Sequence, residues 1–387
     1  MSPAPASNAF TIKKLAYVAN SMVPSRQANT VHVLNMCAAF AEAGVEVTLI
    51  ARGDPTAAQT VVRDFGLPRS FAMRLLPRRG PRMLDRLGFL RHVRRSMRGG
   101  GFDFAYGRSG FGLLGGVPAD VPAALDLHVF PAERSPRLVE ARLFARRNFL
   151  FATAITKALR DRYEAVYPKL SGRILVAPCA ARLPDPADHV REPGPLRVYY
   201  VGHLYAGRGI DLILALARLQ PQIAFHIVGG EDRDIALWQG QAPHNVLFHG
   251  YVQPAELPAH YARADVCIAP HSARVAAAGG GSDIARWMSP MKIFEYMSYG
   301  KPVIAADLPV LREILSDRKD AFLCPSDDVG AWNAALEELA SDGDIRVRLG
   351  RAALKKFERE FTWECRARNV LDKAHSLLLE RGPARTA

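Results

Sequence analysis

Short apolar runs alternate with longer amphipathic segments along most of the chain. Residues 15–20 (LAYVAN) predict a strand, residues 31–44 (VHVLNMCAAFAEAG) an amphipathic helix, and residues 45–52 (VEVTLIAR) the next strand. The same order of strand, loop and helix starts again at residues 196–219 (LRVYYVGHLYAGRGIDLILALARL). Strands that alternate with helices are typical of α/β folds with parallel sheets. The pattern therefore predicts two such units in one chain.

Residues 289–314 (SPMKIFEYMSYGKPVIAADLPVLREI) are the most informative stretch, because they predict a loop, a helix, a turn, a strand and a second helix without a gap. Pro290 suits the first helical turn, and Gly300 suits the helix C-terminus. The free N–H groups at such a helix start favour a phosphate. Glu295, one turn further in, could hold ribose hydroxyls. An ordinary helix with a solvated Glu295 is the alternative interpretation.

Residues 132–170 predict helix, and residues 173–178 (RILVAP) predict the last strand of the first unit. The opening lacks G-x-G-x-x-G, which argues against a nicotinamide or flavin site. D-x-D occurs at residues 232–234 and 342–344, but acid-rich loops produce such pairs by chance, and we do not predict a metal site there.

Bulk properties agree with two soluble domains. The chain has 387 residues, too many for one ordinary core, with 49% hydrophobic residues. No apolar run reaches the roughly 18–20 residues that span a bilayer, and the N-terminus lacks the apolar core of a signal peptide. The five cysteines are far apart, which favours neither a disulfide framework nor a zinc site. We expect a cytoplasmic protein.

Positive charge is concentrated in the first half. Residues 1–190 hold 27 Lys and Arg against 14 Asp and Glu, a net +13, whereas residues 191–387 hold 24 of each. The densest part, residues 69–98, also has apolar residues at helical spacing: Met83, Leu87, Leu90, Val93 and Met97. It predicts a basic amphipathic helix on an anionic membrane surface, or else a core helix with solvated arginines. Nucleic acid is disfavoured, since no nucleic-acid-binding motif is present.

The segment SPMKIFEYMSYGKPVIA resembles the signature helix of the retaining glycosyltransferases of GT-B fold, the glycosyl transferases group 1 or glycosyltransferase family 4. This resemblance implies an α/β fold with two Rossmann-like domains that face a cleft and a C-terminal helix that crosses back to the first domain. The domains would be residues 1–190 on the acceptor side, residues 191–365 on the donor side, and residues 366–387 as the returning helix and tail.

The resemblance also assigns donor-binding residues. Glu295 matches the second of two glutamates eight residues apart, while the first falls on Trp287. In the loop Gly202–Gly209, Arg208 stands where the family has lysine and His203 where it has arginine. A cation in a glycine-bounded loop before a helix can neutralise a diphosphate. The expected donor-binding residues are His203, Arg208, Pro290, Met291, Lys292 and Glu295.

On the first domain, Asp126-Leu127-His128 matches the family's Glu-x-His, whose histidine reaches the sugar and phosphate. A structural histidine is the alternative. Ser25, Arg26 and Asn29 are the polar residues of the first loop, which faces the cleft in the related enzymes. We predict His128, Arg208 and Glu295 as catalytic residues.

The predicted activity is hexosyl transfer with retention from a UDP- or GDP-sugar, without cofactor or metal. The acceptor could be lipid-linked or a precursor of a cell-surface polysaccharide, and the enzyme could lie peripherally on the inner face of the cytoplasmic membrane. Two alternatives stay open. One is a nucleotide-sugar epimerase or phosphorylase on the same fold, and the other is a degenerate, membrane-bound partner protein.

Overall fold

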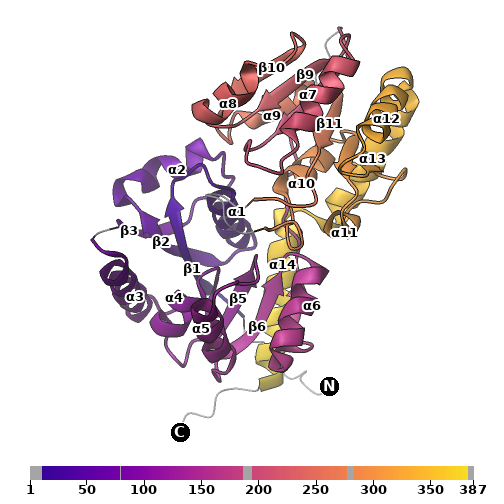
Figure 1. Ribbon diagram of the computed structural model, residues 1–387. Helices are drawn as coiled ribbons and strands as arrows, with labels where there is room; N and C mark the ends of the chain where they lie inside the picture. Colours follow the sequence, from indigo (N-terminus) through magenta and orange to yellow (C-terminus); the bar gives the residue numbers. More distant parts are fainter. Residues whose placement is uncertain (1–10, 79, 186–193, 277–282, 382–387) are drawn as a thin grey trace, which may run out of the picture.

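The strands form two parallel sheets, which are coloured indigo to magenta and red to orange in Figure 1. The computed structural model describes residues 11–78, 80–185, 194–276 and 283–381. The strand orders are β3-β2-β1-β4-β5-β6-β7 and β10-β9-β8-β11-β12-β13. Chain order reverses beside β1 in the first sheet and beside β8 in the second. Ligands of open α/β sheets bind at such switch points, outside the carboxyl ends of the strands.

Residues 14–176 contain the first sheet and the helices on its two faces. Its strands are β1 (Lys14–Val23), β2 (Glu46–Gly53), β3 (Ala72–Leu76), β4 (Phe104–Gly107), β5 (Ala123–Leu127), β6 (Phe149–Ala154) and β7 (Ile174–Val176). Its helices are α1 (Ala28–Glu42), α2 (Ala58–Asp64), α3 (Arg82–Arg98), α4 (Gly110–Gly116), α5 (Arg134–Phe144) and α6 (Lys157–Val166).

Residues 197–360 contain the second sheet with its helices. Its strands are β8 (Arg197–Val201), β9 (Ala224–Val228), β10 (Val246–Gly250), β11 (Val266–Ala269), β12 (Val303–Ala306) and β13 (Phe322–Cys324). Its helices are α7 (Ile210–Leu219), α8 (Asp232–Gln239), α9 (Leu257–Arg263), α10 (Met291–Ser298), α11 (Pro309–Arg312), α12 (Val329–Ser341) and α13 (Gly343–Glu360). The predicted boundary between residues 190 and 191 lies outside the described residues.

The last helix, α14 (Trp363–Arg381), leaves the second sheet and packs on α1 and β6 of the first, as the yellow ribbon in Figure 1 shows. Trp363, Val370 and Ala374 are buried in the first-domain core. A parallel bridge between Ala181 and Thr362 fixes the point where the chain crosses. The returning helix was therefore predicted correctly, although it begins at Trp363 rather than at residue 366.

One sequence prediction about local structure was wrong. Residues 132–170 are not helical throughout, because β6 lies between α5 and α6. Its sequence, FLFATA, is fully buried on both faces, so it has no alternation that would separate it from an apolar helix segment. The predicted basic helix is present as α3, and its apolar residues differ in exposure along its length: Val93 and Met97 are buried, whereas Met83 is 76% exposed and Leu87 is 45% exposed. None of the described helices is long and apolar enough to span a bilayer.

Gly350 lies inside α13, where its missing side chain allows the backbone of Gly300 to approach. A Cβ atom on Gly350 would stand 1.9 Å from the Gly300 carbonyl oxygen. Gly300 itself has φ of +60°, so the turn after α10 cannot easily shift. Helix propensity alone would favour alanine at Gly350 by about 1 kcal/mol. Packing against backbone reverses that sign.

We expect Gly350→Ala to lower the melting temperature, because overpacking costs about 1–3 kcal/mol. Gly88 is the matched control, since it lies inside α3 with nothing within 4 Å of a built Cβ. Gly88→Ala should raise the melting temperature by its gain in helix propensity. Calorimetry of both variants checks the opposite signs, and stabilisation by Gly350→Ala would contradict this packing.

Candidate active site

The donor-side residues meet where β8, β11 and the start of α10 come together. The Lys292 ammonium lies 3.7 Å from the centre of the Tyr200 ring. Gly202 has φ of +144°, and a Cβ on it would stand 2.8 Å from Lys292 Nζ. A side chain at position 202 would thus displace the lysine. Glycine is favoured here mainly because L side chains rarely adopt a φ of +144°.

Three cationic or polar side chains of this group have buried nitrogen atoms without a hydrogen-bond partner among the described residues. They are Arg208 Nε, Lys292 Nζ and both ring nitrogens of His271. Native structures pair almost all buried polar atoms, so a cluster of unpaired donors needs an explanation. An anion that accepts hydrogen bonds from the cluster provides one.

The electrostatics of this cluster agree with an anion site. Burial lowers the pKa of Lys292 well below its usual value, and the nearby Arg208 lowers it further. Burial, Lys292 and Arg208 also lower the pKa of His271 well below the ordinary range of histidine. Arg208 therefore makes Lys292 and His271 harder to protonate, and Lys292 has the same effect on His271. A bound anion would reverse this repulsion.

Glu295 lies further along α10, with its carboxylate accepting a 2.5 Å hydrogen bond from the Tyr261 hydroxyl. Burial raises the pKa of Glu295, while the Tyr261 hydroxyl and Lys292 oppose that rise. Pro290 forms the N-cap of α10, and Met291 packs against the cores of both domains. The expected helix start is confirmed, and Glu295 has a partner rather than being merely solvated.

The loop after β1 approaches the second domain through one of its three predicted residues. The Arg26 guanidinium lies 4.2 Å from the centre of the Tyr251 ring, after β10. Ser25 instead bonds Thr30 Oγ1 at 2.7 Å, and Asn29 bonds Gln27. Ser25 and Asn29 therefore shape their own loop, whereas Arg26 reaches across the cleft.

His203 lies between the cluster of Arg208 and Lys292 and the loop that carries Arg26. Its ring stacks on Tyr205 with centroids 4.7 Å apart, and its carbonyl accepts a hydrogen bond from Tyr200 at 2.6 Å. Burial lowers the pKa of His203, and Arg208 adds to the effect. A neutral ring does not replace the charge of the family's arginine.

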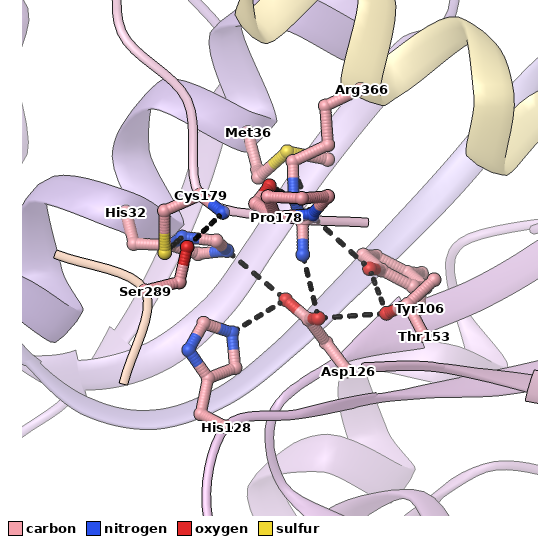
Figure 2. Close-up of polar contacts among 10 residues, drawn as sticks. All are labelled: His32, Met36, Tyr106, Asp126, His128, Thr153, Pro178, Cys179, Ser289 and Arg366. Carbon is pink, nitrogen blue, oxygen red and sulfur yellow. Dashed lines mark hydrogen bonds and ion pairs between the residues drawn. The ribbon is translucent and has the colours of Figure 1, made fainter. Parts of the chain in front are cut away.

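The first-domain part of the site is a buried network around Asp126, at the end of β5 (Figure 2). Asp126 Oδ2 lies 3.0 Å from the Nε2 atoms of both His32 and His128. Asp126 Oδ1 accepts hydrogen bonds from Thr153 Oγ1 at 2.7 Å and from Arg366 Nη2 at 2.9 Å. One carboxylate thus joins residues of α1, β5, β6 and α14.

Burial would raise the pKa of Asp126, but the Arg366 guanidinium and the two histidines outweigh it and hold the pKa well below its usual value. The pKa of His128 falls to about 4, chiefly because of burial and the nearby Arg108. His128 is therefore a neutral imidazole beside an ionised carboxylate.

His32, His128 and Cys179 offer ligand atoms that lie within 4.8 Å of one another. Cys179 Sγ is 3.8 Å from His32 Nδ1, and the Cys179 N–H donates to Ser289 Oγ at 3.0 Å. Two imidazoles and a sulfur could suit zinc. However, burial raises the pKa of the Cys179 thiol to about 11, and the network already contains the Arg366 cation. These observations favour a hydrogen-bonded network over a metal centre.

Sequence reasoning missed His271, His32 and Arg366. His271 is the second residue after β11, so its place at the carboxyl end of a central strand was an available signal. His32 and Arg366 lie inside helices, where neither periodicity nor spacing distinguishes them from other residues. Trp287, at the position of the family's first glutamate, packs against the core and offers no carboxylate.

Comparison with known proteins bears on the second domain most directly. Residues 195–342 match the family described as Glycosyl transferases group 1. The resemblance seen in the sequence is confirmed. A GDP-mannose-dependent alpha-(1-6)-phosphatidylinositol monomannoside mannosyltransferase of Mycobacterium tuberculosis is 30% identical over 184 residues, 45% of this chain and 46% of that protein. An uncharacterized 41.2 kDa protein in the cps region of Klebsiella pneumoniae is 26% identical over 136 residues, 34% of each chain. The chain thus matches less than half the length of these curated relatives.

Solved structures match nearly the whole chain. HepE from Anabaena, in complex with UDP and glucose, has a TM-score of 0.70 at 16% identity and covers 94% of this chain and 100% of its own. Sucrose-phosphate synthase from Thermosynechococcus elongatus has a TM-score of 0.70 at 17% identity, covering 95% and 100%. The predicted GT-B fold is confirmed.

We expect Lys292→Met to raise the melting temperature near neutral pH, because it removes a buried ammonium group that has no hydrogen-bond partner among the described residues. The folded-state pKa of Lys292 is depressed, so at intermediate pH the unfolded state binds more protons and wild-type stability rises with pH. The advantage of Lys292→Met should therefore shrink between about pH 7 and 9.5. Calorimetry at both pH values measures it.

Lys355→Met, at an exposed lysine of α13, is the control and should leave the melting temperature nearly unchanged at both pH values. A lower melting temperature for Lys292→Met than for wild type at both pH values would contradict the account.

Proposed function

We propose that this protein is a retaining glycosyltransferase that moves a hexose from a nucleoside-diphosphate sugar to an acceptor. The observation that carries the proposal is the cluster of buried nitrogen atoms of Arg208, Lys292 and His271 at the switch point of the second sheet, which have no hydrogen-bond partner within the described part of the chain. Its charge and donor count suit a diphosphate. The HepE structure, which holds UDP and glucose on a similar fold, supports this class of donor.

The leaving group determines what the site must do. As the bond to the anomeric carbon breaks, negative charge grows on the diphosphate, and positive charge grows on the sugar ring. Arg208 and Lys292 stabilise the departing diphosphate, aided by the free N–H groups at the start of α10. Glu295 holds the ribose, and Arg26 with Tyr251 lies at the outer side of the same cleft.

Retention follows from a front-face reaction. A double displacement needs a second carboxylate as nucleophile on the sugar, and position 287 carries tryptophan instead. The departing phosphate oxygen takes the proton of the acceptor hydroxyl on the same face, while His128 contacts the transferred sugar. We propose that no metal is required, since two side-chain cations stand where a metal would otherwise neutralise the diphosphate. Metal analysis of the purified protein tests this point.

We further propose that the acceptor is lipid-linked and that α3 rests on an anionic membrane. The first turns of α3 expose Met83, Leu84 and Leu87 at 76%, 63% and 45%, and exposed arginines follow on the same helix. On α5, Leu138 is 53% exposed between the exposed Arg134 and Arg142. Both helices pack against α4, so they cover the same face of the sheet. Apolar residues flanked by arginines suit an interface of anionic headgroups.

Binding and transfer assays test the proposed donor site. Arg208→Ala should weaken nucleoside diphosphate binding about tenfold or more and nucleoside binding little, because a charge-assisted contact to phosphate contributes about 1.5–3 kcal/mol. Glu295→Gln should weaken nucleoside and diphosphate alike. Isothermal titration with UDP, GDP and ADP, followed by transfer assays with their sugars, measures both.

Equal diphosphate affinity of Arg208→Ala and wild type would contradict the assignment of Arg208 to the diphosphate. Sugar interconversion without acceptor would instead favour an epimerase, and failure to bind any nucleotide sugar would favour a degenerate partner protein.

For the membrane, wild type should sediment with phosphatidylglycerol vesicles at low salt and be released by high salt, since exposed charges are screened over about 8–10 Å near physiological ionic strength. Arg91→Glu/Arg95→Glu should stay in the supernatant, because each basic residue contributes roughly 1 kcal/mol at an anionic surface.

Arg351→Glu/Lys355→Glu, with the same spacing on the exposed side of α13, should sediment like wild type. If both double variants lose binding equally, the attraction is a property of net charge, and α3 has no special part in it.

A further inference from the structure

The hydrogen bonds around Asp126 determine which nitrogen of each neighbouring histidine carries the proton. Four groups surround one buried carboxylate, and both side chains of the Asp126–Arg366 ion pair are at most 2% exposed. We propose that Arg366 and Asp126 fix His128 as the tautomer that carries its proton on Nε2, so that Nδ1 accepts a hydrogen bond from a hydroxyl of the transferred sugar. This inference rests on the proposed function for its substrate, but its proton assignment does not.

The Asp126 carboxylate can only accept hydrogen bonds. An ionised carboxylate has no proton to donate, so every group within hydrogen-bond distance must donate to it. Arg366 Nη2 and the Thr153 hydroxyl donate to Oδ1, at 2.9 and 2.7 Å. Oδ2 is 3.0 Å from each of two histidine Nε2 atoms. His32 and His128 must therefore both carry a proton on Nε2.

Arg366 keeps the Asp126 carboxylate ionised. A buried carboxylate without a counter-ion would take up a proton, and could then donate to a histidine. Arg366 is itself held in place, because its Nε donates to the Pro178 carbonyl at 2.9 Å. It comes from the first turns of α14, beside Trp363, whose ring meets His32 edge to face at 5.1 Å. The returning helix thus supplies the charge that decides the tautomers.

The second ring nitrogen of each imidazole, Nδ1, carries no proton in this tautomer. A neutral histidine with its proton on Nε2 has a lone pair on Nδ1. For His32 this nitrogen faces Cys179 Sγ at 3.8 Å. The His128 side chain is 13% exposed, and its Nδ1 is neither bonded nor sealed off within the described part of the chain. Figure 2 shows this nitrogen on the side of the ring away from Asp126.

An acceptor-only nitrogen at this place selects a chemical group. A sugar hydroxyl can donate to it, whereas a fluorine or a ring oxygen at the same position cannot and would leave two acceptors facing each other. Sites built to bond a hydroxyl reject analogues that lack one strongly, because the buried partner stays unpaired. His128 Nδ1 therefore accepts a hydrogen bond from one hydroxyl of the donor sugar, and Arg366 and Asp126 are positioning residues.

The proton assignment is tested by nitrogen NMR on full-length protein labelled with 15N-histidine, using His128→Gln to assign the signal. Wild type should show His128 protonated on Nε2. Asp126→Asn keeps the shape but can turn its amide N–H toward the histidines, which moves the His128 proton to Nδ1. A wild-type proton on Nδ1, or an unchanged tautomer in Asp126→Asn, would overturn the proposal whether or not the protein transfers sugar.

Kinetics with a panel of donor sugars, each with one hydroxyl replaced by fluorine, test the recognition. Fluorine also withdraws electrons from the ring in both proteins, so the comparison between them is decisive: at one position the loss in kcat/KM should be about tenfold larger for wild type than for Asp126→Asn, whose His128 Nδ1–H can face fluorine. Equal penalties at every position in both proteins would overturn the hydroxyl assignment.

Arg366→Lys should retain the Nε2 tautomer, because it keeps the charge, whereas Arg366→Met should lose it. Arg368→Met, at an exposed arginine of the same helix, is the matched control and should leave tautomer and rate unchanged. If Arg366→Met fails to fold, Asp126→Asn and the wild-type spectrum still decide the question. A wild-type tautomer in a folded Arg366→Met would show that Arg366 has no positioning role.

Discussion

The buried ion pair between Asp126 and Arg366 is the interaction on which the first half of the site depends. Taking both charges out of water costs several kcal/mol, and good geometry with further hydrogen bonds must offset that cost. Here Thr153, His32 and His128 supply those bonds. Because Arg366 lies on α14, the pair also ties the returning helix to the first sheet. The same contact therefore joins the fold to the orientation of His128.

The second half of the site shows the opposite arrangement. Among the described residues, the atoms of Arg208, Lys292 and His271 named above have no hydrogen-bond partner, and the charge of Arg208 disfavours protonation of Lys292 and His271. Such an arrangement lowers the stability of the ligand-free protein, as stored strain does at many functional sites. On one side of the cleft the charges are paired and hold a histidine still. On the other side, Arg208 and Lys292 form the proposed anion site.

The sequence predicted the fold well, because the fold rests on local signals. The stretch of residues 289–314 contains its own helix start, glycine turn and buried strand, and the structure has all three. The Asp126 network could not be predicted, since α1 and α14 bring His32 and Arg366 together from positions 334 residues apart in the chain (366 − 32). The strand β6 was missed for a different reason, because burial on both faces removes the alternation that identifies a strand.

The central claim is that the cations of the second domain and the imidazole of the first hold two ends of one donor molecule. A crystal structure of the protein with a nucleoside-diphosphate sugar that cannot be transferred tests it most directly. We expect the diphosphate oxygens to lie within hydrogen-bond distance of Arg208 and Lys292, and one sugar hydroxyl to lie against His128 Nδ1. A diphosphate bound away from Arg208 and Lys292, or a sugar that points out of the cleft, would contradict the account.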